Sequence, residues 1–270
     1  MHKIDDILAC IKEMAPEELA EHWDNCGLTV ASETESAECV VVCLDVTREV
    51  IEEAINSRAR LIISHHPLIF NPIKQISCES RLGPLLRALI KNDVALYTAH
   101  TNVDKTYGGL NDLLAGIIGI ETPHPDDACA QLSYFRVGEM PRAYTADGFN
   151  KYVSARLRMN DMIISSGTPP GKLIKKVLVM SGAYSLETRQ VAATGADAVV
   201  CGEMRHHEVL ELTALGAHIV QAGHHGTERF FIQLIEKWIT DRFPDMPVKG
   251  VGFINHPSIF FHGENVNGDV

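Results

Sequence analysis

The feature that most constrains the fold is a repeat of short apolar runs, each followed by a stretch with helical periodicity. Three runs occur in each half of the chain, at 39–45, 60–66, 94–100, 176–182, 196–203 and 217–224. Strands that are apolar on both faces are typical of parallel sheets, because helices cover such sheets from both sides. The repeat therefore predicts an α/β fold with two lobes, each a mostly parallel sheet covered by helices.

Apolar residues at helical spacing mark the segments around these runs. They predict helices over 49–57, 82–91 and 110–118 in the first half, and near 185–194, 205–215 and 227–242 in the second. Two further helices are expected before the first strand, and Pro16 stands at the start of the second of them.

The stretch 120–170 interrupts the repeat. It holds a strand-like run at 132–138, a helix-like run at 149–159 and a loop rich in Pro and Gly at 165–172. We interpret it as a connector that adds edge elements to the second half. The predicted lobes are residues 1–125 and 126–270, and the second is expected to end with one more strand and an irregular tail.

Composition excludes several classes of protein. The 270 residues carry a net charge of −11, which disfavours nucleic acid as a partner because phosphate binding relies on clustered Lys and Arg. No apolar run approaches the ~18 residues of a membrane helix, and the first residues do not resemble a secretory signal. Seven cysteines without a C-x-x-C pair indicate reduced, mostly buried thiols. We therefore expect a cytoplasmic protein without membrane contact.

Histidines and carboxylates gather where the predicted strands end, and this is where open parallel sheets bind ligands. Seven of the 13 histidines lie in four such clusters: His65-His66, the run from His100 to Asp104, Glu203 with His206-His207, and His224-His225 with Glu228. Neutral imidazole together with carboxylate suits divalent metals such as Zn, Fe or Mn, and the absence of Cys argues against a thiolate-rich structural zinc site. The clusters predict a metal centre.

Two neighbouring ions would need a bridging carboxylate, and Asp104 and Glu228 are the candidates. Pro67 keeps His66 extended, so His65 and His66 can each face a different ion. Spacing alone leaves open whether His224 or His225 is the ligand in the last cluster.

Five motifs in order give the chain a specific resemblance: WDNCGL (23–28), SHHPLIF (64–70), HTNVD (100–104), GEMRHHE (202–208) and GHHGTE (223–228). With these, the chain resembles the GTP cyclohydrolase I type 2 family, also called NIF-three-like. The resemblance implies a two-lobed α/β fold, a dinuclear metal centre between the lobes and a ring-shaped homohexamer. The chain is similar to the short form, without an insertion between the lobes.

The motifs of the family also match individual residues of this chain, by their position in each motif. The resemblance implies that the metal ligands are His65, His66, Asp104, His224 and Glu228, and it favours His224 over His225. His100, Glu203 and His207 are then the expected catalytic residues, which orient ligands or move protons near pH 7. A role for His206 has less support. Trp23-Asp24-Asn25 is expected to form a turn against the N-terminal helices, with a place at the pocket rim as the alternative, and Asp45 faces the cleft without a predicted partner.

Metal-dependent hydrolysis is the leading hypothesis for function. Two divalent ions would activate a water, and the family name points to opening of the GTP ring with release of formate. The chain has no glycine-rich phosphate motif, so the cations near the strand ends are the candidates for binding the phosphates: Lys74, Arg81, Lys105 and Arg205. The alternatives are a metal-binding scaffold or regulatory protein, and a metal-dependent phosphoesterase.

Overall fold

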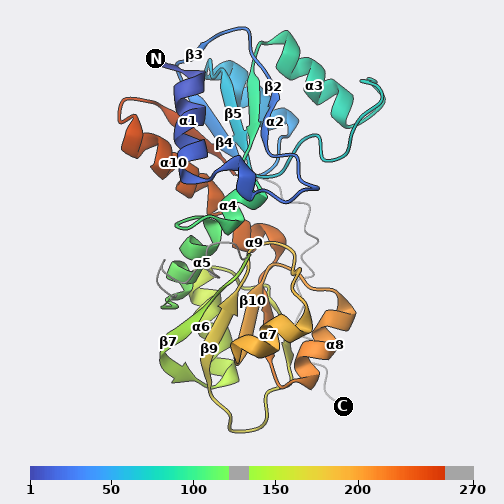
Figure 1. Cartoon of the computed structure of the whole chain (residues 1–270), viewed down its shortest axis with the longest axis vertical. Coiled ribbons are helices and arrows are strands. Elements are labelled where there is room, and N and C mark those ends of the chain that lie inside the picture. Colours follow the sequence, from blue (N-terminus) through green and yellow to red (C-terminus); the bar gives the residue numbers. More distant parts are fainter. Residues whose placement is uncertain (122–133, 253–270) are drawn as a thin grey trace, which may run out of the picture.

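Two five-stranded sheets dominate the computed structural model, which describes residues 1–121 and 134–252 (Figure 1). The first sheet has the order β12-β4-β5-β6-β2. Its parallel strands are fully or partly buried and its edge strand β2 is antiparallel; the bounds are β2 Gly27–Val30, β4 Val40–Cys43, β5 Leu61–Ser64, β6 Ala95–Thr98 and β12 Val248–Val251. A small pair, β1 His2–Lys3 with β3 Ser36–Ala37, lies beside it.

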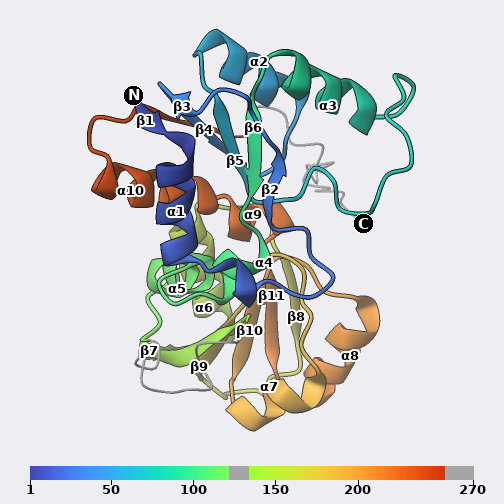
Figure 2. The same ribbon diagram turned by 45° about the horizontal axis from the view of Figure 1, so that its top comes forward.

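Helices cover both faces of the first sheet, as the unbroken apolar runs predict (Figure 2). One face packs against α1 (Ile4–Met14) and α10 (Phe231–Arg242), and the other against α2 (Arg48–Asn56) and α3 (Leu82–Lys91). Alternate residues of β4 serve the two faces: Val40 and Val42 contact the first pair, and Val41 and Cys43 the second.

The second sheet has the order β7-β9-β10-β11-β8, with β9 (Ile174–Val179), β10 (Ala198–Cys201) and β11 (His218–Gln221) parallel. The antiparallel edges are β7 (Arg136–Tyr144) and β8 (Ile163–Ser166). Both edges come from the connector, so the prediction that this segment adds edge elements is confirmed. One face packs against α5 (Leu110–Ile118) and α6 (Ala146–Leu157), and the other against α7 (Thr188–Thr194) and α8 (His206–Ala214).

The end of the chain does not stay in the second lobe, and the prediction that assigned all of 126–270 to it is wrong on this point. The apolar stripe of α10 packs with α1 in the core of the first sheet, and β12 runs parallel to β4. Periodicity predicts a helix and a strand here, but it cannot say which sheet has a free edge. A smaller difference concerns the helix expected after Pro16, which is a single 3-10 turn, Glu17–Leu19. The tail beyond 252 and the start of the predicted strand at 132–138 lie outside the described residues.

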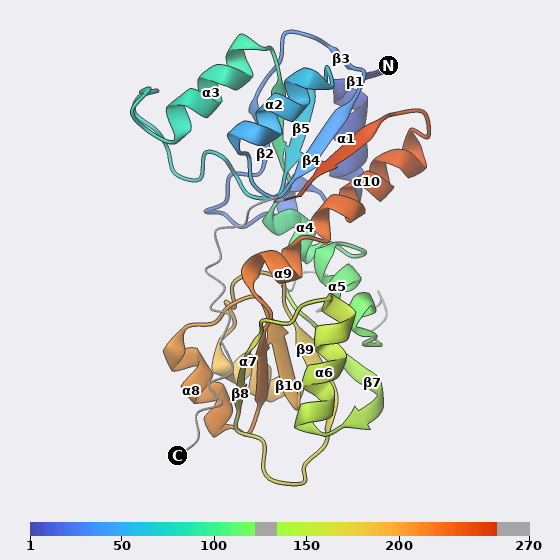
Figure 3. The ribbon, with the colours of Figure 1, turned by 180° about the vertical axis from the view of Figure 1, so that it is seen from behind.

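The parallel strands of the two sheets point their carboxyl ends toward one another. The short helices α4 (Thr101–Lys105) and α9 (His224–Glu228) lie between the sheets, directly after β6 and β11 (Figures 1 and 3). This arrangement brings polar segments from both halves of the chain to one place.

The cysteines and the lengths of the helices can also be described. Six cysteines fall in the described part of the chain; all are free thiols and four are buried. Across residues 1–121 and 134–252, no helix is both long and apolar enough to cross a membrane.

Candidate metal centre

Glu228 lies between the polar clusters of the two halves, and its side chain is almost completely buried. Its Oε2 atom is 2.9 Å from His66 Nε2 and 3.0 Å from His224 Nε2. Its Oε1 atom faces a different partner, His65 Nε2, at 3.7 Å. The two oxygens of one carboxylate therefore face two separate sets of imidazole nitrogens.

His65 carries the most informative atom of the site. The ring is fully buried, and Nδ1 hydrogen-bonds the carbonyl of Ala99 at 3.0 Å. Nε2 has no hydrogen-bond partner, because Asp104 Oδ1 at 3.8 Å and Glu228 Oε1 at 3.7 Å are both too far away. A buried polar atom left without a partner is costly, whereas ligands about 2.1 Å from one ion lie roughly 3 to 4 Å apart. These residues therefore fit a metal ion.

Local structure explains how two adjacent histidines reach the same centre. The parallel ladder continues past β5, with the His65 amide donating to Cys43 and the His66 amide to Leu44. Both backbones are thus held while the chain leaves the regular strand, and the two ring centroids lie 5.1 Å apart. The sheet fixes these ligands before the loop begins.

Each of four histidines uses Nδ1 for a contact within the protein. His65 binds a carbonyl, His66 binds Asp45 at 3.0 Å, His100 binds Asp24 at 2.9 Å and His224 binds Glu203 at 3.2 Å. Such contacts fix the ring orientation and leave Nε2 as the nitrogen for a metal. Ligand atoms within 4.8 Å of one another form two groups that could hold an ion, His65-His66-His100 and His66-His224-Glu228.

Several predicted residues meet at this centre and others do not. Asp104 accepts a hydrogen bond from Ser181 Oγ at 3.2 Å, and Asp45 has His66 as the partner that sequence reasoning lacked. His206 and His207 are exposed in the first turn of α8 and do not line the pocket beside the centre. The structure thus does not bring the predicted catalytic residue His207 to the site, because the helix starts there and turns the side chain toward solvent.

Gly182 is a residue of the site that sequence reasoning missed. Its φ of +63° suits glycine, and a Cβ at this position would lie 2.1 Å from Glu228 Oε1. The only signal in the sequence is a glycine at the end of a predicted strand run, a place that Gly202 and Gly223 also take in the two runs that follow.

Comparison with known proteins decides the family. The family model described as Duf34/NIF3 (NGG1p interacting factor 3) matches residues 2–257. The chain belongs to the NIF3 family. The resemblance inferred from the five motifs is therefore confirmed.

NIF3 relatives cover most of the chain. A GTP cyclohydrolase 1 type 2 homolog from Clostridium perfringens is 33% identical over 231 residues, 84% of this chain and 87% of the relative. NIF3-like protein 1 of Drosophila melanogaster is 30% identical over 84% of this chain and 79% of its own length. Reduced HcgD from Methanocaldococcus jannaschii is a solved structure with a TM-score of 0.78 and 27% identity, covering 93% and 98% of the two chains.

A NIF3-related protein from Bacillus cereus shares the fold, with a TM-score of 0.82, 22% identity and coverage of 96% and 99%. The predicted α/β fold of the NIF-three-like type is therefore confirmed.

Electrostatics in this NIF3 centre are those of a site for cations. Burial would lower the pKa of His66, but hydrogen bonds to Asp45 and Glu228 raise it to about 10. Burial acts on the pKa of His224 in the same direction, and Glu228 raises that pKa to about 9. Burial would raise the pKa of Glu228, yet its contacts with His224 and the other imidazoles hold it well below the usual range. The two protonated imidazoles thus balance the carboxylates of Glu228 and Asp45, and a metal ion would take the place of their protons.

A pocket of about 860 Å³ opens beside the centre. Both halves of the chain line it, with Trp23, Phe70 and His100 from the first and Met180, Leu186 and Arg205 from the second. Trp23 therefore takes the alternative position that the sequence allowed, at the pocket rim. The volume suits a small-molecule ligand.

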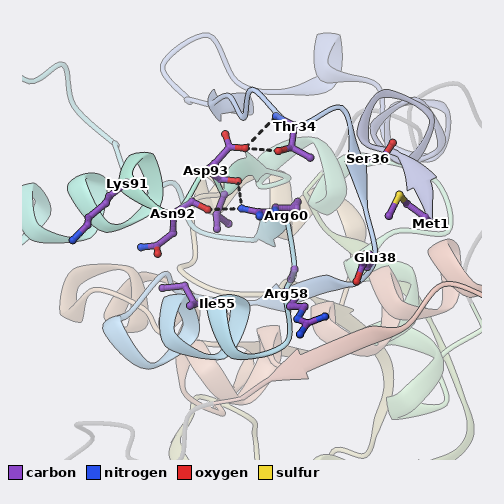
Figure 4. A pocket seen from close by; sticks show the side chains of 12 residues that line it. Met1, Thr34, Ser36, Glu38, Ile55, Arg58, Arg60, Lys91, Asn92 and Asp93 are labelled. Atoms are coloured by element: carbon purple, nitrogen blue, oxygen red, sulfur yellow. Dashed lines mark hydrogen bonds between the residues drawn. The ribbon is translucent and has the colours of Figure 1, made fainter.

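A second hollow of about 650 Å³ lies at the opposite, amino end of the first sheet (Figure 4). Its central charges are bound within the protein: Arg60 Nη1 donates to the Asn92 carbonyl at 2.7 Å, and Asp93 accepts from the Thr34 amide and hydroxyl. Figure 4 also shows Arg58 and Lys91 pointing away from one another. The charges of Arg60 and Asp93 are therefore already hydrogen-bonded within the protein.

Proposed function

We propose that this NIF3 protein is a hydrolase whose centre would hold two divalent metal ions, Zn, Fe or Mn, with Glu228 as a ligand to both. The single observation that carries the proposal is that Glu228 Oε1 faces His65, whereas Oε2 contacts His66 and His224. His65, Asp104 and Oε1 would hold one ion, and His66, His224 and Oε2 the other. Such a pair, when bound, supplies a nucleophile from water at neutral pH and polarises the bond that is cleaved.

The chain's own residues contribute positioning and proton transfer. The Asp24 side chain is fully buried and accepts hydrogen bonds from His100 Nδ1 and from the amide and hydroxyl of Thr101. It therefore keeps the Nδ1 proton of His100 in place and leaves Nε2 to take up or release a proton at the pocket. Glu203 orients His224 from the solvent side, and this is the role we assign to it in place of direct catalysis.

For the substrate we propose GTP or a similar nucleotide, with ring opening and release of formate. Support comes from the name shared by several relatives, GTP cyclohydrolase 1 type 2 homolog, and from the size of the pocket. Of the four cations expected near the strand ends, Arg205 lines this pocket, whereas Lys105 forms an ion pair with Glu21 at 2.5 Å. Arg205 is thus the best placed to meet a phosphate.

The test is incubation of metal-loaded protein with GTP, followed by detection of formate. We expect turnover by the natural chain and by His206→Ala, whose side chain is exposed away from the pocket, and none by His65→Ala. Equal formate production by the natural chain and His65→Ala would contradict the proposal. Two retained ions without turnover would instead favour a metal-binding scaffold or regulatory role.

We also propose that the chain assembles as a homohexamer, as the family resemblance implies. Light scattering on purified protein should then give about six times the chain mass of 29.7 kDa. A monomeric or dimeric mass at micromolar concentration would contradict this.

A further inference from the structure

We infer that the pocket beside the metal centre selects a ligand with a flat heteroaromatic ring, and that Trp23 and Phe70 form the surface on which this ring stacks. The inference rests on the proposed function in one respect, namely that the same pocket takes the ligand. It concerns binding, so it can be tested without turnover.

Trp23 and Phe70 are unusual in their exposure. Among residues 1–121 and 134–252 they are the only exposed tryptophan and phenylalanine, with 50% and 49% of their surface accessible. Their ring centroids lie 5.8 Å apart at an interplanar angle of 45°, and the Trp23 and His100 centroids lie 6.4 Å apart in an edge-to-face arrangement. Two large apolar rings are thus held together in solvent at the entrance to a metal centre.

The backbone on which these rings stand is fixed by polar contacts. Asn25 Nδ2 donates to the carbonyl of Ile69 at 2.6 Å, which ties the segment next to Trp23 to the segment next to Phe70. On the same side, Asp24 accepts hydrogen bonds from His100 and from Cys26 Sγ. The aromatic pair is therefore preorganised, although its exposed faces contribute little burial to folding.

The surroundings favour a ring with polar atoms over an aliphatic ligand. Glu21, Thr101 and Gln190 line the same pocket, and Arg205 adds a positive charge. An aliphatic chain would remove these groups from water without offering them hydrogen bonds, which is costly. A heteroaromatic ring presents an apolar face for Trp23 and polar edge atoms for its neighbours, and an anionic tail on that ring would meet Arg205.

Tryptophan fluorescence provides a direct test, because the chain has two tryptophans and the other, Trp238, is buried in the core of the first sheet. We would titrate metal-loaded protein with guanosine monophosphate and, separately, with ribose 5-phosphate, which lacks the ring. We expect guanosine monophosphate to quench Trp23 and to bind at least tenfold more tightly than ribose 5-phosphate. Quenching should disappear in Trp23→Phe.

Calorimetric titration with guanosine monophosphate then measures the contribution of stacking in variants that lack the fluorescent reporter. Trp23→Ala and Phe70→Ala should each weaken binding about tenfold, which is the order of a single base–aromatic stack, and Trp23→Phe should retain most of the affinity. Ile76→Ala is the matched control, because Ile76 is equally exposed on the same loop as Phe70 but does not line the pocket.

Equal affinity for the two ligands, or unchanged affinity in Trp23→Ala, would overturn the inference. A change in oligomeric mass caused by Trp23→Ala would also overturn it, since the pair would then be a contact between copies of the chain. Ring-selective binding without formate release would leave the inference standing and count against the hydrolase. An unchanged rate of formate release in Trp23→Ala would support the hydrolase and count against the stacking surface.

Discussion

The two hollows at opposite ends of the first sheet differ in what their polar atoms do. At the carboxyl end, a fully buried nitrogen of His65 lacks a partner and faces two carboxylates. At the amino end, Arg60 and Asp93 are hydrogen-bonded to neighbouring backbone (Figure 4). Both hollows are large and both contain charges. The comparison teaches that volume and charge do not distinguish a binding site here, whereas an unsatisfied buried atom does.

The charges at the amino end have a structural explanation. Two residues after α2 and after α3, the chain there takes the left-handed conformation, at Arg58 with φ 56° and at Asp93 with φ 53°. Arg60 reaches the carbonyl of Asn92 just after α3, where a positive charge is favoured by the helix dipole. Arg60 thus stabilises a helix end, whereas the buried His65 Nε2 at the carboxyl end is costly until a cation binds.

The largest effect is expected from Glu228→Gln, which removes the charge shared by both groups of imidazoles. We expect metal affinity to fall more than ~100-fold and at least one ion per chain to be lost in elemental analysis. Glu203→Gln, which only orients His224, should weaken binding by about 10- to 100-fold. Two ions bound to Glu228→Gln at unchanged affinity would show that this carboxylate is not the bridge.

Gly182→Ala tests whether the close approach to Glu228 matters. The new Cβ would collide with Oε1, so the carboxylate must move, and we expect a loss of metal affinity of at least tenfold. Gly171→Ala is the matched control, because Gly171 has a similar positive φ but open space around it. Both variants should lose about 1–2 kcal/mol of stability from backbone strain, measured by urea denaturation. Equal metal binding in the two variants would contradict the steric explanation.

The pH dependence of stability should have opposite signs with and without metal. In metal-free protein the folded pKa of His66 is about 10, above its unfolded value, so its contribution is complete below about pH 6.5 and is lost as pH rises toward 10. A bound metal requires unprotonated imidazoles, so its stabilisation grows over the same range. Urea denaturation between pH 6 and 9, with chelator or with zinc, checks this. Parallel pH profiles would contradict it.

The smallest effect is expected at the amino end of the sheet. Arg60→Ala should lower stability by about 1–2 kcal/mol, because a charged donor to a helix-terminal carbonyl is lost, and should leave metal affinity unchanged. Arg58→Ala, whose side chain is exposed, should change stability by less than about 0.5 kcal/mol. A loss of metal binding or turnover in Arg60→Ala would break the distinction between the two hollows.

Much of the fold was predictable because parallel strands have a strong local pattern. Runs such as 39–45 and 60–66 are apolar on both faces, and α3 begins and ends at the predicted residues, 82 and 91. The gathering of histidines followed from the same pattern, since parallel strands in one sheet share an edge for their carboxyl ends. The sequence-based prediction places α10 and β12 in the wrong lobe, because strand order depends on which edge of a sheet remains free.

The sequence by itself determined that this is an α/β protein of the NIF3 family with imidazoles and carboxylates at its strand ends, because periodicity and motifs are local properties of the chain. Only the tertiary structure decided which of those groups meet. His66 and Glu228 are 162 residues apart, yet they lie 2.9 Å from one another, while the adjacent His206 and His207 stay in solvent. The reason is that a metal centre depends on distances between atoms, and these are set by how the two sheets face each other.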